Sequence, residues 1–350
     1  MKILLSALES SANLHASKVI DELEKKGSVE LFGIYELSKY KNQIYKSSEF
    51  SAMGFLGVLH LIKKAKRAIK EMVELARSAD AVLLIDSPAF NIPLAKALKK
   101  AKIKAKITYY ILPQVWAWKE YRAKIVRQNC DNLASILPFE AKFYENSHFV
   151  GHPLLEEIKV EKNPQKTHKI VFMPGSRRSE IKNLMPVFKS LAKEIKEQKI
   201  IVVPPHIKGR QEQYYGLCDD FSFAYDANEA LSNADFAFIC SGTATLQAAL
   251  IGTPFVLCYK AKAIDVFLAR LFVRNLRHIG LANIILDFLD RPALHSEFLQ
   301  DEVCPNNLLK AFNQCEFSAF KARAEELKEY LKAPKSASEN VANLLLKNSI

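Results

Sequence analysis

Seven consecutive residues, Pro174-Gly175-Ser176-Arg177-Arg178-Ser179-Glu180, combine side-chain types that bind phosphate. They follow a short apolar run and precede a segment with helical periodicity. Backbone N–H groups of a Gly-Ser turn at a helix start can face an anion, and guanidinium groups can neutralise it. We therefore predict a phosphate site formed by Ser176, Arg177 and Arg178. A surface turn with solvated arginines is the alternative.

A second turn of this kind begins at Cys240 and continues as Ser-Gly-Thr-Ala-Thr-Leu-Gln. Ser241, Gly242 and Thr243 would let the backbone approach a diphosphate or a ribose closely. A tight turn with a helix cap has the same composition. Two such turns in one half of the chain favour a site for a phosphorylated donor.

Polar residues also follow two apolar runs in the first half of the chain. Asp86 comes directly after residues 81–85, while Glu9 and Ser11 come after residues 3–7. A general base would occupy such a position, although an Asp after a strand more often caps a turn or a helix. His152, between a Gly and a Pro, is either a titratable donor at a hinge or a structural residue bonded to its own loop.

An apolar stretch runs directly into a basic one between Met53 and Lys70. This mixture favours a surface that dips into an anionic bilayer, where each cation contributes about 1 kcal/mol. A buried helix with a basic end is the alternative. The expected membrane-contacting residues are Phe55, Leu56, Leu59, Lys63, Lys64, Lys66 and Arg67.

The net charge of +12 over 350 residues suits nucleic acid, anionic lipid or phosphorylated substrates alike. No segment interleaves aromatic and basic residues, so we expect no nucleic-acid partner. No set of His, Cys and carboxylates has metal-ligand spacing, and we predict no metal and no cofactor. P-loop and dinucleotide fingerprints are also missing, which argues against an ATPase or a dehydrogenase. The six cysteines lack C-x-x-C spacing and fit a reducing cytoplasm.

Short apolar runs alternate with helix-period segments almost throughout, as in βαβ units with parallel sheets. No run is long enough for a membrane-spanning helix. The expected strands are 3–7, 29–35, 81–85, 106–112 and 133–137, then 170–173, 200–203, 221–225, 236–240 and 255–259.

The polar stretch 159–168 interrupts this alternation. We predict an α/β protein with two Rossmann-like doubly wound domains, over residues 1–160 and 168–335. A helix over 336–350 is expected to pack back on the first domain. Two such domains form an interdomain cleft, and their ligands bind beyond the carboxyl ends of the strands, where the polar motifs lie.

Taken together, the motifs resemble those of the lipid-A-disaccharide synthases, bacterial inverting glycosyltransferases of the two-Rossmann-domain (GT-B) class. The similarity extends from about Ser6 to about Leu309. It is carried by residues 86–91 (Asp-Ser-Pro-Ala-Phe-Asn), 113–118 (Pro-Gln-Val-Trp-Ala-Trp), 137–140 (Leu-Pro-Phe-Glu), 143–144 (Phe-Tyr), 150–153 (Val-Gly-His-Pro), 174–180 and 241–244 (Ser-Gly-Thr-Ala).

The resemblance implies that UDP-2,3-diacylglucosamine is condensed with 2,3-diacylglucosamine 1-phosphate to give the β-1,6-linked lipid A disaccharide and UDP. It implies Asp86 as the general base, with Glu9 and Ser11 near it, and Arg177 on the donor diphosphate. It adds Gln247, Asn283 and Gln300 to the donor site. It also implies a peripheral position on the cytoplasmic face of the inner membrane, and it leaves a homodimer open.

The family pattern is not complete in this chain. After the first strand the family has Gly-Glu-Ala-Ser-Gly-Asp, where residues 8–13 read Leu-Glu-Ser-Ser-Ala-Asn. Ala89 replaces an Asp, Ala282 replaces a Pro, and Gln247 replaces a Glu that would grip ribose hydroxyls. An amide can still accept such hydrogen bonds.

Other GT-B enzymes that use a UDP-sugar are the main alternative. They include a peptidoglycan transferase with a polyprenyl acceptor and a UDP-N-acetylglucosamine 2-epimerase. A basic nucleic-acid-binding protein and a catalytically silent membrane-binding scaffold are alternatives of a different class.

Overall fold

The computed structural model describes residues 1–50, 55–240, 242–260 and 276–347, apart from the side chains of 55–61. The chain divides into two compact units. Unit 1 consists of residues 1–156 and 331–350, and unit 2 consists of residues 157–330. The C-terminal segment therefore belongs to the same unit as the N-terminus.

Unit 1 is built on a seven-stranded sheet in the order β3-β2-β1-β4-β5-β6-β7. Every pair of neighbouring strands is parallel. The strands are β1 (Lys2–Ala7), β2 (Glu30–Ile34), β3 (Gln43–Tyr45), β4 (Ala81–Ile85), β5 (Lys106–Tyr110), β6 (Asn132–Ser135) and β7 (His148–Phe149).

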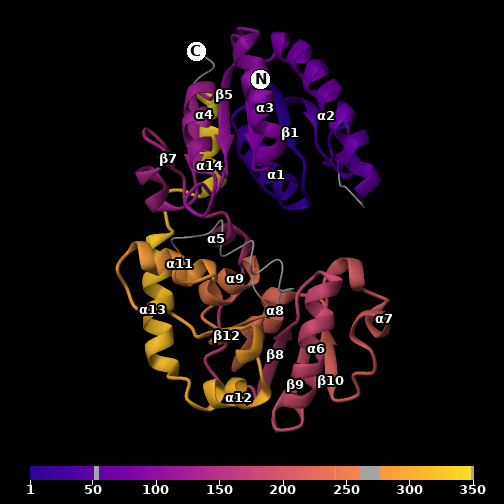
Figure 1. Ribbon diagram of the computed structural model, residues 1–350. Helices are drawn as coiled ribbons and strands as arrows, with labels where there is room; N and C mark the ends of the chain where they lie inside the picture. The colour runs from indigo at the N-terminus through magenta and orange to yellow at the C-terminus, as the bar shows by residue number, and fades with distance from the viewer. Residues whose placement is uncertain (51–54, 241, 261–275, 348–350) are drawn as a thin grey trace. The chain divides into compact units, whose positions relative to one another are not determined.

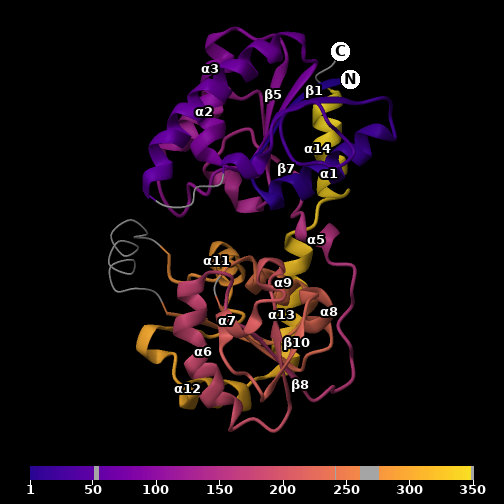
Figure 2. The ribbon, with the colours of Figure 1, turned by 90° about the vertical axis from the view of Figure 1, so that its right-hand side faces the viewer.

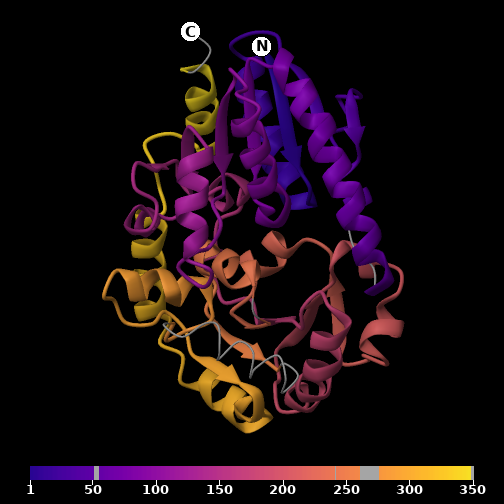
Figure 3. The ribbon, with the colours of Figure 1, turned by 45° about the horizontal axis from the view of Figure 1, so that its top comes forward.

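Alternate side chains of these strands point to opposite faces, and both sets are apolar because helices cover both faces. Leu4 and Leu84 belong to a core formed with α2 (Phe55–Leu75), α3 (Pro88–Lys100) and α4 (Tyr121–Asn129). Leu5 and Leu83 belong to a core on the other face, formed with α1 (Ser10–Glu24) and α14 (Ala337–Leu346). Figure 2 shows the sheet between these two layers, and Figure 3 shows α4, α3 and α2 in a row in front of the strands.

Unit 2 repeats this plan with a six-stranded parallel sheet in the order β10-β9-β8-β11-β12-β13. Its strands are β8 (Lys169–Met173), β9 (Gln198–Val202), β10 (Phe221–Ala224), β11 (Phe236–Ile239), β12 (Phe255–Tyr259) and β13 (Glu297–Leu299). The ring of Phe172 lies 5.2 Å from the rings of Phe188 and Phe238, so aromatic packing joins α6 (Arg178–Ala192) to the sheet.

Helices cover both faces of this sheet as well (Figure 1). With α6 lie α7 (Gln211–Tyr215) and α12 (Pro305–Asn313). The opposite layer consists of α8 (Ala227–Ser232), α9 (Thr243–Ile251), α11 (Leu281–Phe288) and α13 (Phe317–Tyr330). A short helix, α5 (Leu154–Glu157), ends where unit 2 begins.

The topology confirms the α/β class with two doubly wound parallel sheets. The units divide between Glu156 and Glu157 rather than inside the polar stretch 159–168, and residues 331–335 belong to unit 1. The C-terminal α14 packs against α1, where Lys26 Nζ donates to Asn343 Oδ1 at 2.5 Å. The sequence does not indicate β3, β7 and β13, because strands of two or three residues are too short to show an apolar pattern.

Within the described residues, no helix combines the length and the apolar character that crossing a bilayer requires.

Candidate active site

The carboxyl ends of β1 and β4 meet at the centre of the unit 1 sheet. After β1 the chain adds strands toward the β3 edge of the sheet, and after β4 it adds strands toward the β7 edge. The place where the direction reverses is the switch point, at which doubly wound sheets bind their ligands. Ala7 and Ile85, the last residues of the two strands, are paired. Glu9 and Asp86 follow these strand ends, so the fold places together two carboxylates that are distant in the sequence.

The turn that carries Asp86 has a strained backbone that buried polar groups hold in place. Asp86 and Ser87 both have positive φ, 48° and 45°, and such a conformation costs about 1–3 kcal/mol per residue. Asn91 of α3 donates to the Asp86 carbonyl at 2.8 Å and accepts from Ser6 Oγ at 2.6 Å. Tyr109 donates a further hydrogen bond to the same carbonyl at 2.7 Å. The position of Asp86 is therefore fixed from three elements.

The carboxyl groups of Asp86 and Glu9 are both partly withdrawn from water. Burial raises the pKa of Asp86, while a backbone hydrogen bond from Ser87 and the charge of His15 act in the opposite direction. The pKa of Glu9 is raised first by partial burial and then by the negative charge of Asp86. Carboxylates with raised pKa values accept protons more readily than ordinary surface carboxylates, as a general base requires.

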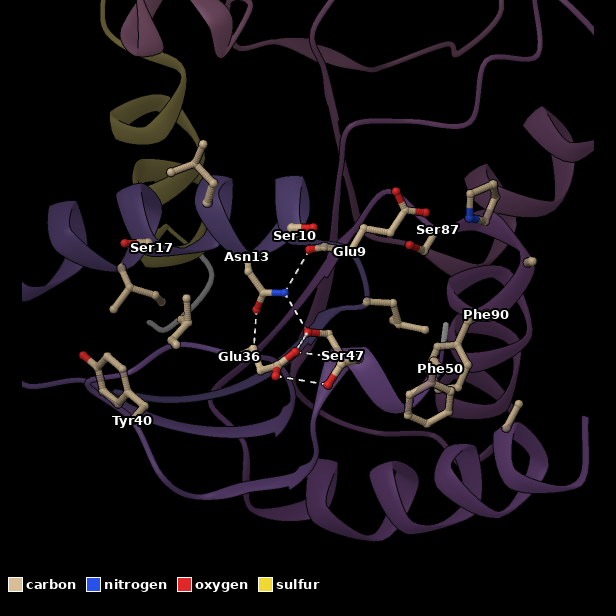
Figure 4. A pocket seen from close by; sticks show the side chains of 18 of the residues that line it. Glu9, Ser10, Asn13, Ser17, Glu36, Tyr40, Ser47, Phe50, Ser87 and Phe90 are labelled. Carbon is tan, nitrogen blue, oxygen red and sulfur yellow. Dashed lines mark hydrogen bonds between the residues drawn. The ribbon is translucent and has the colours of Figure 1, made fainter. Parts of the chain in front are cut away.

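A pocket of about 1370 Å³ opens beside this turn, and all its lining residues belong to unit 1. Glu9 lines it after β1, and Ser87 and Phe90 line it after β4. Figure 4 shows these three side chains around the pocket together with Phe50. Ser87 Oγ is buried and has no hydrogen-bond partner among the described residues. A polar group of a ligand would satisfy it.

Asn13 ties the pocket wall to the first helix (Figure 4). Its amide donates to the carbonyls of Ala7 and Glu9 at 3.2 and 2.9 Å and to Ser47 Oγ at 3.0 Å. Its Oδ1 accepts from the backbone N–H of Glu36 at 2.6 Å. A carboxylate at position 13 would oppose the two carbonyl oxygens with like partial charge, because it cannot donate. The asparagine that departs from the family pattern therefore matches its surroundings.

In unit 2 the turns after β8 and β11 also meet at the switch point of the sheet. Met173 and Ile239, the last residues of the two strands, are paired. Gly175 has φ +99°, and a Cβ there would lie 3.3 Å from Cys240 Sγ and 2.5 Å from Glu180 Oε2. The two turns that the sequence identifies as anion sites therefore touch, and position 175 requires glycine.

The turn after β8 already holds a carboxylate of the chain itself. Glu180 Oε2 accepts from the backbone N–H groups of Ser176 and Arg177 at 3.2 and 3.1 Å. Glu180 Oε1 lies 3.2 Å from the Arg177 guanidinium. This corrects the expectation that these N–H groups face an anion, because Glu180 occupies them. The Arg177 side chain is 79% exposed, so an anion in solvent can still reach it.

Arg178 and Ser176 have partners within unit 2. The Arg178 guanidinium lies 5.5 Å from the ring centre of Tyr214. The Ser176 carbonyl lies 3.0 Å from His206 Nε2. Arg178 is thus held to one side of the turn by aromatic packing, which leaves Arg177 as the arginine beside the switch point.

The turn after β11 is exposed. Gly242 and Thr243 lie at the start of α9 with their surfaces open to solvent, and Ser241 lies outside the described residues. Gln247 of α9 donates to Asn228 Oδ1 at 2.7 Å. Its N–H is therefore engaged within unit 2.

Asn283 corrects the expected donor site. It is fully buried, and its amide donates to the His295 carbonyl and to Glu297 Oε1 at 2.9 and 2.8 Å. Its Oδ1 accepts from the Leu294 N–H at 2.8 Å. These bonds hold residues 294–297 and leave no face of the amide for a ligand. Gln300 follows β13 with φ 54°, and β12 separates that strand from β11.

His152 is structural rather than a titratable donor. It is buried, its Nδ1 accepts from the Leu154 N–H at 3.2 Å, and burial lowers its pKa to about 3. The two tryptophans differ in environment. Trp116 is buried with its ring 5.7 Å from that of Phe139, whereas Trp118 is 45% exposed and lines the pocket.

The expected membrane-contacting residues are described only in part: the side chains of Phe55, Leu56 and Leu59 lie outside the described part of the chain. Lys64 lies 2.6 Å from Glu49, and Arg67 lies 2.8 Å from Glu71. Both cations are therefore paired within unit 1, an arrangement that the sequence does not indicate. Lys63 and Lys66 are exposed.

Sequence reasoning missed Asn13, Asn91, Lys119 and Arg122, which hold or line the unit 1 site. Asn13 and Asn91 end the segments 8–13 and 86–91 that carry the family pattern, Lys119 directly follows the segment 113–118, and Arg122 lies four residues beyond that segment. Among the described residues, no cluster of three or more His, Cys, Asp or Glu side chains is placed to hold a metal ion.

Sequence comparisons with known proteins agree with one another. The family model described as lipid-A-disaccharide synthetase matches residues 3–345. The lipid-A-disaccharide synthase of Campylobacter jejuni (strain RM1221) is 52% identical, with 98% of each chain covered. That of Helicobacter pylori (strain HPAG1) is 45% identical, with 97% of each chain covered.

The chain is also similar to a solved structure of much lower identity. The crystal structure of Acinetobacter baumannii MurG has a TM-score of 0.61 and 13% identity, with 99% of each chain covered. Similarity at this identity concerns the fold alone, so it does not favour the chemistry of that protein.

Proposed function

Because this chain belongs to the lipid-A-disaccharide synthase family, we propose that the unit 1 pocket holds the acceptor sugar and the unit 2 turns hold the donor. The chain is a GT-B glycosyltransferase that forms the lipid A disaccharide. The proposed substrates are UDP-2,3-diacylglucosamine as donor and 2,3-diacylglucosamine 1-phosphate as acceptor. One observation carries the proposal: two carboxylates with raised pKa values lie at the switch point, beside a pocket of about 1370 Å³.

In the proposed reaction, Asp86 removes the proton of the acceptor 6-hydroxyl. The hydroxyl oxygen forms a bond to C1 of the donor sugar as the bond from C1 to the UDP oxygen breaks. A single displacement of this kind inverts the configuration at C1, as a β-linked product requires. Burial of the Asp86 carboxyl favours the proton on it after transfer, because removal from water disfavours the ionised form.

On the donor side, negative charge develops on the diphosphate as it departs, and Arg177 is the cation placed to stabilise it. In the proposal the diphosphate takes the Arg177 guanidinium from Glu180, while Glu180 keeps the backbone N–H groups that shape the turn. Gly242 and Thr243, at the start of α9, add backbone N–H groups on the other side.

The acyl chains of both substrates belong in a bilayer, so the proposal includes peripheral binding to the cytoplasmic face of the inner membrane. Exposed residues near the start of α2 support a membrane-binding surface there. Ile62 is 47% exposed there, next to the exposed Lys63 and Lys66. Ile62 also lines the unit 1 pocket, so the apolar surface continues into the site.

The reaction is tested by incubating the purified chain with the two diacylated sugars and measuring UDP and the disaccharide by mass spectrometry. We expect equal amounts of both products. Release of UDP only with a polyprenyl-linked acceptor, or epimerisation of UDP-N-acetylglucosamine without an acceptor, would contradict the proposal.

The membrane surface is tested by flotation with phosphatidylglycerol vesicles. We expect the double variant Lys63→Glu/Lys66→Glu to bind at least tenfold more weakly, since each cation contributes about 1 kcal/mol near anionic headgroups. The matched control is Lys193→Glu/Lys196→Glu, which makes the same change in net charge at exposed lysines of unit 2. Equal losses in the two double variants would show a general charge effect and no specific surface.

A further inference from the structure

We infer that Lys119 and Arg122 bind the anomeric phosphate of the acceptor sugar and so select a phosphorylated acceptor. The inference rests on the proposed function, because it takes the unit 1 pocket as the acceptor site. It identifies a subsite that the sequence motifs do not include.

Of the described residues that line the pocket, three are cations: Lys39, Lys119 and Arg122. Lys39 is paired with Glu24. No ion pair joins Lys119 or Arg122 to a carboxylate within the described part of the chain. These two side chains therefore bring positive charge to the pocket without a counter-ion from the protein.

The side chains of Lys119 and Arg122 both contact the indole ring of Trp118. Lys119 Nζ lies 4.0 Å from the centre of the indole ring, and the Arg122 guanidinium carbon lies 5.4 Å from it. Attraction to the ring holds each cation, but the two positive charges repel each other. A dianionic phosphate between them would remove that repulsion, and Arg122 could bind it through two parallel N–H groups.

Arg122 also lies within electrostatic reach of the turn that carries the base. The pKa of Tyr109 is raised by burial and by the charge of Asp86, and the charge of Arg122 acts in the opposite direction. The Tyr109 hydroxyl donates to the Asp86 carbonyl at 2.7 Å. Arg122 and Ser87, the residue that follows the base, both line the pocket.

The chemistry of the acceptor fits this arrangement. Its 1-phosphate is carried on C1 and its reacting 6-hydroxyl on C5 through C6, the two carbons that flank the ring oxygen, so a base at the hydroxyl requires a phosphate site within the width of one sugar ring. The anomeric phosphate of the donor is joined to UMP by a phosphoanhydride bond and is bound by unit 2 in the proposed function. A site for a terminal phosphate in unit 1 would thus distinguish the acceptor from the donor.

The test compares 2,3-diacylglucosamine 1-phosphate with its dephosphorylated form in steady-state kinetics, with the donor saturating. We expect Lys119→Ala and Arg122→Ala each to raise KM for the phosphorylated acceptor about tenfold or more, as expected for loss of a charge-assisted hydrogen bond. KM for the dephosphorylated acceptor should change less than about twofold, because the lost contact has no partner there. The KM for the donor and kcat should stay close to wild type. Lys124→Ala, an exposed lysine of α4 outside the pocket lining, is the matched control.

An equal loss with both acceptors would overturn the inference, since the residues would then act through packing.

A lipid headgroup is the other source of phosphate. If the variants lose binding to phosphatidylglycerol vesicles, and if the KM defect disappears in neutral detergent micelles, the ligand is the headgroup and the inference is wrong. If the wild-type chain makes no disaccharide, the proposed function fails and the subsite fails with it. Disaccharide formation by the wild type, with no difference between the acceptors in the variants, rejects the subsite alone.

Discussion

The turn that carries Asp86 in unit 1 and the turn that carries Arg177 in unit 2 each follow a central strand at the switch point of a doubly wound sheet, Asp86 after the second strand of the pair and Arg177 after the first. Their surroundings differ. Buried side chains hold the Asp86 turn and burial raises the pKa of its carboxyl, whereas the Arg177 side chain is 79% exposed. A carboxylate becomes a stronger base when water is removed from it. An arginine can bind a highly charged diphosphate from solvent. In the proposed function, the acceptor side is therefore formed before its ligand binds, and the donor side is completed by its ligand.

The largest effect should come from Asp86→Asn. We expect kcat to fall by about 10²–10⁴, the usual contribution of a general base. The same change should raise the free energy of unfolding at neutral pH, because a pKa raised by folding means that the ionised carboxylate destabilises the native state. Product assays and thermal unfolding check both parts. Normal turnover of Asp86→Asn would show that Asp86 is not the base. A lower stability would show that its ionised carboxylate does not destabilise the native state.

Arg177→Ala should lower kcat about a hundredfold, as expected for the loss of one transition-state donor. Stability should change by less than about 0.5 kcal/mol, because exposed ion pairs contribute little. Arg77→Ala is the matched control, since Arg77 is exposed and pairs with Glu74 at 3.0 Å with the same three-residue separation. Activity near wild type in Arg177→Ala would exclude this arginine from the donor site.

The pH dependence of kcat/KM should reflect the titration of Asp86 in unit 1 and should not depend on Arg177 in unit 2. The base acts when ionised, so kcat/KM should fall as the pH decreases through the raised pKa of Asp86, at a higher pH than for an ordinary aspartate. Because burial raises the pKa of Asp86 and the charge of Asp86 in turn raises that of Glu9, Glu9→Gln should leave this fall at nearly the same pH. Arg177→Ala should lower the whole profile without shifting it. A shift in the arginine variant instead would assign the titration to the donor side.

The smallest effect should come from Gln247→Ala. Its amide is engaged with Asn228 at 2.7 Å, so any contact with the donor ribose is one neutral hydrogen bond. We expect the Kd for UDP to rise about two- to tenfold, as for the loss of such a bond. Titration calorimetry measures this change, with Gln213→Ala as a control at an exposed glutamine of α7. A larger loss would mean that position 247 retains the role of the family's glutamate.

Sequence reasoning located both turns because each polar motif follows a buried strand, and the apolar runs mark those strands. It could not identify Glu180 as the partner of the Ser176 and Arg177 N–H groups, since a carboxylate in the first turn of a helix looks the same whether it caps the helix or faces solvent. It also placed Asn283 at the ligand. That amide is fully satisfied inside the protein, and only its partners on residues 294–297 reveal this.

The sequence alone predicts the α/β class, the succession of the longer strands, and the positions of Asp86 and Arg177 at strand ends, because alternation and turn composition are local properties of the chain. Only the tertiary structure decided that β1 lies beside β4 and β8 beside β11. Strand order depends on which helices cover each face and on packing between segments that are distant in the chain. That order joins Glu9 to Asp86 and places the two turns of unit 2 in contact.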